Sequence, residues 1–182
     1  MKIRLNQDEM LSLWRIRHAL EPLHSDGVVT RADGIDLDRH LLNCIDDWYL
    51  NLLDTASVEY LAPTDISADV AVKRNDDNSA VIILPERCRR IIEVKLNCWL
   101  QPALIITDPT SPDALLQQNP YSRGNPTAPV AIVNHRKLIL YSIPDNADTS
   151  IDRLLCIVNP DSGYYEMDQR ALSLINQKHP LI

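Results

Sequence analysis

The side chains that most often carry out covalent chemistry are scattered along this sequence. The cysteines lie far apart and form no CxxC pair, so neither a zinc site nor a dense disulfide framework is indicated. No two histidines are spaced as neighbouring metal ligands on one helix. We therefore predict no metal and no cofactor, and we interpret the cysteines as small buried residues in a reducing compartment.

One alternative function is a small cytosolic hydrolase of phage or mobile-element origin. A thiol nucleophile needs a neighbouring base, so this alternative requires Cys88 or Cys98 to lie beside His135 or His40. The sequence contains no GxSxG, HExxH, Walker or GxGxxG motif that would mark a familiar catalytic framework. We therefore predict a protein that is not an enzyme, and we assign no catalytic residue.

One concentrated basic cluster lies after Pro85, between two predicted strands. It consists of Arg87, Arg89 and Arg90. These cations either contact an acidic partner or DNA phosphates, or they form a solvated turn. The sequence leaves both interpretations open.

The loop 119–129 is predicted to be rigid, because it contains three prolines and one glycine and has few conformations to lose. We expect Tyr121, Arg123 and Gly124 within it to contact a partner. The Arg123 guanidinium can tie the loop together through several carbonyls, or it can reach a neighbouring carboxylate.

Two helices are predicted before the β-rich part. Asn6 and Glu9 form a capping box for a helix over residues 7–21, and Asp36 is a plausible N-cap for a longer helix ending near Ala56. The second helix is apolar over much of its circumference, which is typical of a helix with two partners. It is either buried within one domain or presents an oligomer interface. The candidate interface residues are Leu41, Leu42, Ile45, Trp48, Tyr49 and Leu52.

The remaining patterns predict a small, mostly antiparallel sheet and a short carboxy-terminal helix over 164–176. The turn residues 75–78 join two strand-like runs into a hairpin over 66–84. Further strands are predicted at 91–96, 103–107, 130–133, 138–143 and 154–158, with a short helix at 113–118. The fold class is therefore α+β. We expect one unit with a helical part (1–62), a β-rich part (63–160) and a carboxy-terminal helix and tail (161–182).

Length and charge narrow the class of protein. A chain of 182 residues is long enough for one substantial core. Its net charge of −7 argues against a general nucleic-acid binder, although an acidic wall can line a DNA passage without gripping the DNA. No run is long and apolar enough to span a bilayer, and residues 1–10 contain no apolar signal core, so we expect no membrane association and a cytosolic site of assembly.

With these residues in view, the chain resembles the head-to-tail connector or neck ring proteins of tailed bacteriophages, in particular those of crAss-like phages. The resemblance covers about residues 65–145. It is carried by Leu84-Pro85-Glu86, the strand Ile91–Leu96, Trp99 with Pro102, the run NPYSRGNP from Asn119 to Pro126, Pro129-Val130, and Leu138–Tyr141.

This resemblance implies a virion structural protein without catalysis. It implies a closed ring of copies of the chain, usually twelvefold, that contacts the portal protein and neighbouring neck or tail ring proteins while DNA passes through the channel. The implied location is the virion neck, and the host cytoplasm during assembly. A second alternative to this function is a cytosolic adaptor that binds another protein through its sheet edge or its tail, residues 177–182.

Overall fold

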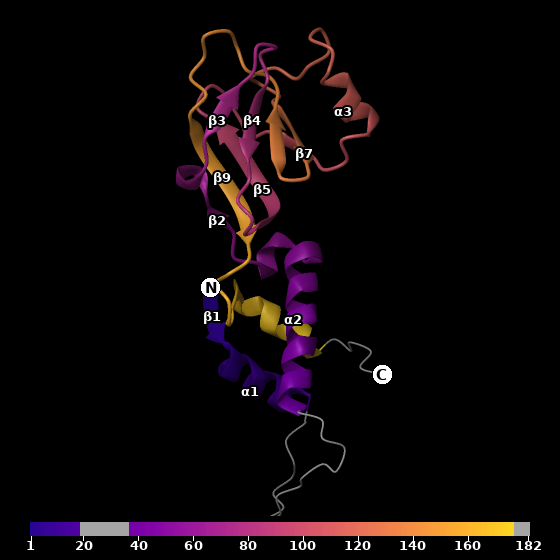
Figure 1. Ribbon diagram of the computed structural model, residues 1–182, viewed down its shortest axis with the longest axis vertical. Coiled ribbons are helices and arrows are strands. Elements are labelled where there is room, and N and C mark those ends of the chain that lie inside the picture. The colour runs from indigo at the N-terminus through magenta and orange to yellow at the C-terminus, as the bar shows by residue number, and fades with distance from the viewer. Residues whose placement is uncertain (19–36, 177–182) are drawn as a thin grey trace, which may run out of the picture. The chain divides into compact units, whose positions relative to one another are not determined.

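The computed structural model describes residues 1–18 and 37–176, and it divides the chain into two compact units (Figure 1). Unit 1 contains residues 1–62 and the segment from 160 onward, and unit 2 contains residues 63–159. We expected one unit of three consecutive parts. The carboxy-terminal part instead returns to the amino-terminal helices, because residues 164–168 pair with residues 2–6.

Unit 1 combines helices with a two-stranded ribbon. Its elements are β1 Lys2–Asn6, α1 Gln7–Arg17, α2 Leu37–Thr55, η1 Val58–Tyr60, β10 Tyr164–Asp168 and η3 Gln169–Asn176. The capping box at α1 is confirmed: the Asn6 side chain accepts from the Glu9 amide, and the Glu9 carboxylate accepts from the Asn6 amide. The predicted end of this helix, the loop before Asp36, the Asp36 cap and the tail 177–182 lie outside the described residues.

The β1–β10 ribbon was not predicted, and it is antiparallel, with Arg4 opposite Glu166. The amino group of Met1 lies 2.7 Å from the Asp168 carboxylate at one end of the ribbon. The predicted helix over 164–176 is therefore wrong for its first five residues. Tyr165 and Met167 alternate with more exposed neighbours, as a strand requires, and only 169–176 are helical, as a 3₁₀ helix.

Aromatic side chains from separate elements fill the core of unit 1. The Trp14 ring meets the Trp48 ring edge-on with centroids 5.5 Å apart, and Tyr49 meets Tyr165 edge-on at 5.1 Å. Such geometry places the positive edge of one ring on the negative face of the other. These contacts hold α1, α2 and β10 together around one apolar centre.

Unit 2 consists of two sheets and a short helix. Its elements are β2 Thr64–Asp65, η2 Ser67–Asp69, β3 Val72–Arg74, β4 Ala80–Ile83, β5 Cys88–Leu96, β6 Leu104–Ile106, α3 Pro112–Leu116, β7 Val130–Asn134, β8 Lys137–Leu140 and β9 Ile151–Val158. One sheet has the order β2-β9-β5, and the other has the order β3-β4-β8-β7-β6. Of the described strand pairs, all but β6–β7 are antiparallel, which agrees with the predicted sheet character.

The core of unit 2 lies between its two sheets. Val94 of β5 and Leu154 of β9 come from one sheet, while Ile82 of β4 and Leu140 of β8 come from the other. All four are completely buried. Both sheets are thus apolar on their facing sides, as in a β-sandwich.

Two details of the predicted β-rich part are corrected. The single sheet is divided into separate sheets, and the strand predicted over 66–73 is interrupted. Asp65 accepts a hydrogen bond from the Ser67 amide and starts the 3₁₀ turn η2, so only Val72–Arg74 continues into the confirmed hairpin with β4. The chain is therefore α+β, with a strand before its first helix. No helix among the described residues is long and apolar enough to cross a membrane.

Candidate interaction surface

The five-stranded sheet of unit 2 has a second apolar face, which we call the outer face. Alternate residues of a strand point to opposite sides of a sheet. Ala80 and Ile82 of β4 belong to the core between the sheets, so Val81 and Ile83 point outward. By the same alternation, Leu104 and Ile106 of β6 lie on the outer face, and Ile105 packs toward the core.

Strand register aligns the outer residues into a row. Val81 lies opposite Ile139, Ile139 lies opposite Ile132, and Ile132 lies opposite Ile106. Directly opposed side chains in a sheet contact one another, so the row forms a continuous apolar strip across four strands. A polar outer side would be usual for a sheet that meets only water on that face.

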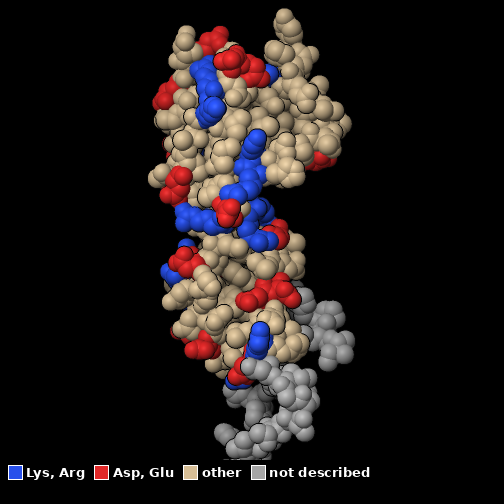
Figure 2. Space-filling model, viewed as in Figure 1, with Lys and Arg blue, Asp and Glu red and all other residues tan. Residues whose placement is uncertain are grey.

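The helix α3 covers part of the outer face and adds exposed leucines beside it. Ala114 is buried against Ile132 and Tyr141. On the other side of this helix, Leu115 and Leu116 are 51% and 52% exposed, and Leu104 of β6 is 64% exposed. Figure 1 shows α3 beside β7, and the corresponding region of Figure 2 is largely tan, with few charged side chains. The exposed leucines of β6 and α3 mark candidate contacts for another protein.

Arg123 fixes the loop that follows α3. Its Nε donates to the Gln117 carbonyl at 2.8 Å, and its terminal nitrogens donate to the Asp77 carbonyl and to the Asp77 carboxylate. Its guanidinium also lies 5.3 Å from the centre of the Tyr141 ring. Both uses that the sequence left open, binding of carbonyls and of a carboxylate, are therefore present, and they join the loop to the β3–β4 turn.

Position 124 has no room for a side chain, so glycine is required there. A Cβ atom there would lie 2.6 Å from the Ala128 carbonyl oxygen and 2.7 Å from the Ser142 hydroxyl. The Gly124 amide donates to the buried Gln117 side chain at 2.9 Å, which closes the loop from inside. Tyr121 is 99% exposed at the outside of the same loop. The predicted rigid loop thus presents one aromatic ring from a firmly held backbone.

Gln117 and Asp77 brace this loop, and the sequence interpretation missed both. Asp77 accepts bonds from the amide and hydroxyl of Ser79, and these bonds, together with Arg123, lower the pKa of its carboxyl. The missed signal is Asp or Asn followed two residues later by Ser or Thr, which is typical of a side-chain-capped turn. It recurs at Asp108-Thr110, Asn125-Thr127 and Asp148-Ser150.

The structure places the candidate oligomer interface of α2 in the interior of unit 1. The residues Leu41, Ile45, Trp48, Tyr49 and Leu52 are buried, and Leu42 is half-buried. They offer little surface to a neighbouring subunit, because the apolar side chains of α2 pack into the core of unit 1. Among the apolar residues of α2, Leu50 remains partly accessible, with 37% of its surface exposed.

The arginines of the basic cluster all have interaction partners. Arg87 is ion-paired with Asp69, and Arg89 and Arg90 also have interaction partners. Arg136, in the β7–β8 turn, is ion-paired with Glu86 at 2.8 Å. In Figure 2, basic and acidic side chains lie next to one another at several places on the face in view. Paired cations of this kind are weaker phosphate ligands than free ones.

Cys88, Cys98 and His135, which the hydrolase alternative names, all lie in unit 2. Cys88 is on β5, beside the strand β9 that carries Cys156. His40 lies 3.9 Å from Cys44, one turn further along α2. Burial raises the pKa of Cys98, which disfavours its nucleophilic thiolate.

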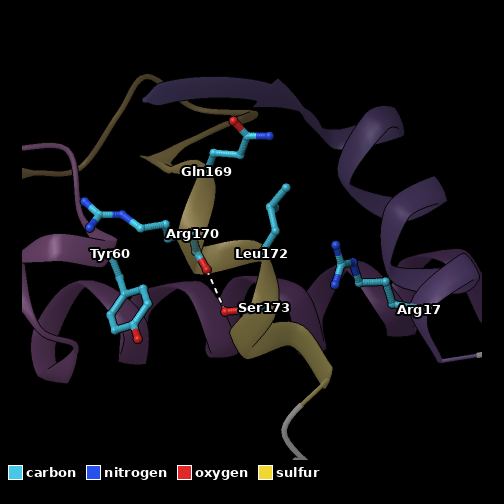
Figure 3. Close-up of a pocket in the computed structure, with 6 residues that line it drawn as sticks. All are labelled: Arg17, Tyr60, Gln169, Arg170, Leu172 and Ser173. Carbon is cyan, nitrogen blue, oxygen red and sulfur yellow. Dashed lines mark hydrogen bonds between the residues drawn. The ribbon is translucent and has the colours of Figure 1, made fainter.

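Unit 1 contains a hollow of about 420 Å³ that is lined by side chains of α1, η1 and η3 (Figure 3). Arg17 lies on one side of Leu172, while Arg170 and Tyr60 lie on the other. Arg170 is bound to Asp168 at 2.8 Å and lies 3.9 Å from Glu59, so its charge is already compensated. The Ser173 hydroxyl donates to the Arg170 carbonyl at 2.7 Å. Arg170 and Ser173 are thus held by contacts within unit 1.

Within residues 1–18 and 37–176, no group of three or more histidine, cysteine, aspartate or glutamate side chains could hold a metal ion. No protein-family model matches the sequence, and no curated protein matches it significantly.

Proposed function

We propose that this chain is a structural protein of a tailed-phage virion, and that copies of it form a closed ring, usually twelvefold, in the neck between portal and tail. The proposal rests on the outer face of the five-stranded sheet, where exposed leucines adjoin a loop fixed by Arg123. The resemblance to connector proteins covers about residues 65–145, the same part of the chain that builds this face. The proposal assigns no catalysis and no cofactor.

A ring sets a physical requirement that guides this assignment. Each copy must contact its neighbours through two different surfaces, so that the contacts repeat around an axis and close. A stable contact of this kind buries at least about 1,000 Å² in total. We assign one of the two surfaces to the outer face, with α3 and Tyr121 at its side, in place of the buried residues of α2.

The charge of the chain supports the proposed DNA channel. Its net charge is −7, and duplex affinity depends on cations that release counterions from phosphates. DNA therefore passes such a ring without being held, and the specific partners are the portal protein and neighbouring neck or tail rings. The proposed location is the virion neck after assembly in the host cytoplasm.

Charge substitutions on the outer face test the proposal. Leu104→Glu and Leu116→Glu place a carboxylate on the exposed leucines, and we expect both variants to lose ring formation because a charge must then be buried in the contact. Ile16→Glu is the matched control, because Ile16 is 67% exposed and lies in unit 1. Native mass spectrometry and electron microscopy, with and without portal protein, give the readout.

Two outcomes would contradict the proposal. One is that the chain stays monomeric with portal protein present and is absent from purified particles. The other is that Leu104→Glu and Ile16→Glu assemble equally well. A monomer that loses binding to some other protein on the same substitutions would favour the adaptor alternative.

A further inference from the structure

Two free thiols meet across the β5–β9 pair in unit 2. Cys88 lies opposite Val158, and Ile91 lies opposite Cys156. In this register Cys88 is diagonal to Cys156 on the neighbouring strand, and Cys88 packs against the core cluster that contains Cys156. Neither thiol is used by the proposed ring contact.

The two thiols differ in access to solvent. Cys156 is completely buried in the core between the sheets, whereas Cys88 is partly exposed and packs against the edge of that core. The neighbouring Cys156 thiol lowers the pKa of Cys88. Because Cys88 is the more exposed of the two, it is the thiol that a peroxide reaches first, and Cys156 lies behind it.

We propose that Cys88 and Cys156 form an oxidisable dithiol, a modification site for small peroxides that closes to an intramolecular disulfide. In the first step the Cys88 sulfur attacks one oxygen of hydrogen peroxide and the O–O bond breaks. Cys88 becomes a sulfenic acid, and the departing hydroxide takes up a proton to form water. In the second step the Cys156 sulfur attacks the Cys88 sulfur, and the hydroxide that leaves takes the Cys156 proton as water. One peroxide thus accepts the two electrons that the two thiols lose.

The disulfide has a mechanical consequence within unit 2. It joins the neighbouring strands β5 and β9 and closes a loop that contains β6, α3, β7 and β8. A cross-link over such a long loop restricts the unfolded chain more than the folded one. We therefore expect oxidation to raise the urea midpoint of unit 2 and thiol reductants to reverse the shift. This inference is independent of the proposed ring.

The test uses the full chain, first reduced and then freed of reductant. It is treated with hydrogen peroxide, its remaining thiols are blocked with N-ethylmaleimide, and its peptides are mapped by mass spectrometry. We expect a Cys88–Cys156 cross-link to appear first, while Cys44 and Cys98 are recovered as blocked thiols. Oxidation of Cys44 or Cys98 at the same rate would overturn the proposal, as would disulfides formed only between chains.

Two variants separate the steps. In Cys156→Ala the reaction should stop at the sulfenic acid of Cys88, which dimedone traps. In Cys88→Ser the buried Cys156 should resist peroxide in the folded chain. A Cys156→Ala protein whose Cys88 shows no dimedone adduct contradicts the mechanism if circular dichroism shows that it is folded. If neither variant folds, the peptide map of the unmodified sequence decides alone.

Discussion

Replacing Tyr49 by phenylalanine removes one oxygen atom and leaves the shape of the side chain unchanged. That oxygen donates to the Glu166 carbonyl and accepts from the Glu166 amide, both at 2.9 Å. Glu166 lies opposite Arg4 in a ribbon of only two strands. Its backbone amide and carbonyl, which bind Tyr49, point away from β1, where the described residues provide no third strand to bind them. The Tyr49 hydroxyl takes the place of that strand.

The expected loss of stability follows from the Glu166 carbonyl and amide, which both lose their partner in the substitution. Tyr49 is 4% exposed, and burial raises the pKa of its hydroxyl to about 12, so the group is neutral and well shielded from water. A buried donor or acceptor that loses its partner costs about 1–3 kcal/mol. Two such groups at a half-buried residue give an expected loss of about 2–3 kcal/mol in the free energy of unfolding of unit 1.

Two measurements check this loss. Urea unfolding is followed by the fluorescence of Trp14 and Trp48, which lie in unit 1, with circular dichroism as a second probe because the two units need not unfold together. Hydrogen exchange at the Glu166 amide should speed up, since the Tyr49 hydroxyl is its acceptor. Tyr121→Phe, at a ring that is 99% exposed, is the control and should be neutral. The reasoning fails if Tyr49→Phe matches the control in both measurements.

Substitutions at Gly124 and Asp77 probe the braced loop and its turn, with Gly163→Ala as a comparison. Gly124→Ala should destabilise unit 2 by about 1–3 kcal/mol, because the new methyl group meets the Ala128 carbonyl oxygen. Gly163→Ala, in unit 1, with φ +85° but no neighbour within 4 Å, should cost that unit only about 1 kcal/mol; equal losses in the free energies of unfolding of the two units would refute the steric reason. The pKa of Asp77 is lowered chiefly by the Ser79 hydroxyl, so the stability it contributes is present above its unfolded pKa and lost as pH falls through the folded value. The unmodified chain should therefore lose stability below about pH 4 more steeply than Asp77→Asn, and parallel pH profiles would contradict this.

Local signals in the sequence predicted local structure well. Asn6 and Glu9 are three residues apart, so the capping box needs no distant partner. The hairpin turn after Arg74 likewise depends on neighbouring residues, and Ser111 caps α3 within one turn. In such places the chemistry of four or five consecutive residues decides the backbone.

Distant partners explain the errors. Tyr164–Asp168 has apolar residues that fit a helix, yet it forms a strand because β1 supplies hydrogen bonds from the other end of the chain. The α2 interface residues were correctly identified as apolar, but nothing in the sequence tells whether a neighbouring subunit or the same unit covers them. The outer face depends on strand register, which aligns Val81 with Ile139 and Ile106 with Ile132. The sequence alone does not give that register.

The pairing of β1 with β10 has a consequence during synthesis of the chain. Residues 63–159 are translated between β1 and β10, so unit 1 cannot complete its ribbon until the segment after unit 2 has been made. Until then Trp14 and Ile45, made early, have no complete core to enter, and they are available to chaperones on the nascent polypeptide. A strand translated after unit 2 thus completes a unit whose helices α1 and α2 were translated before it.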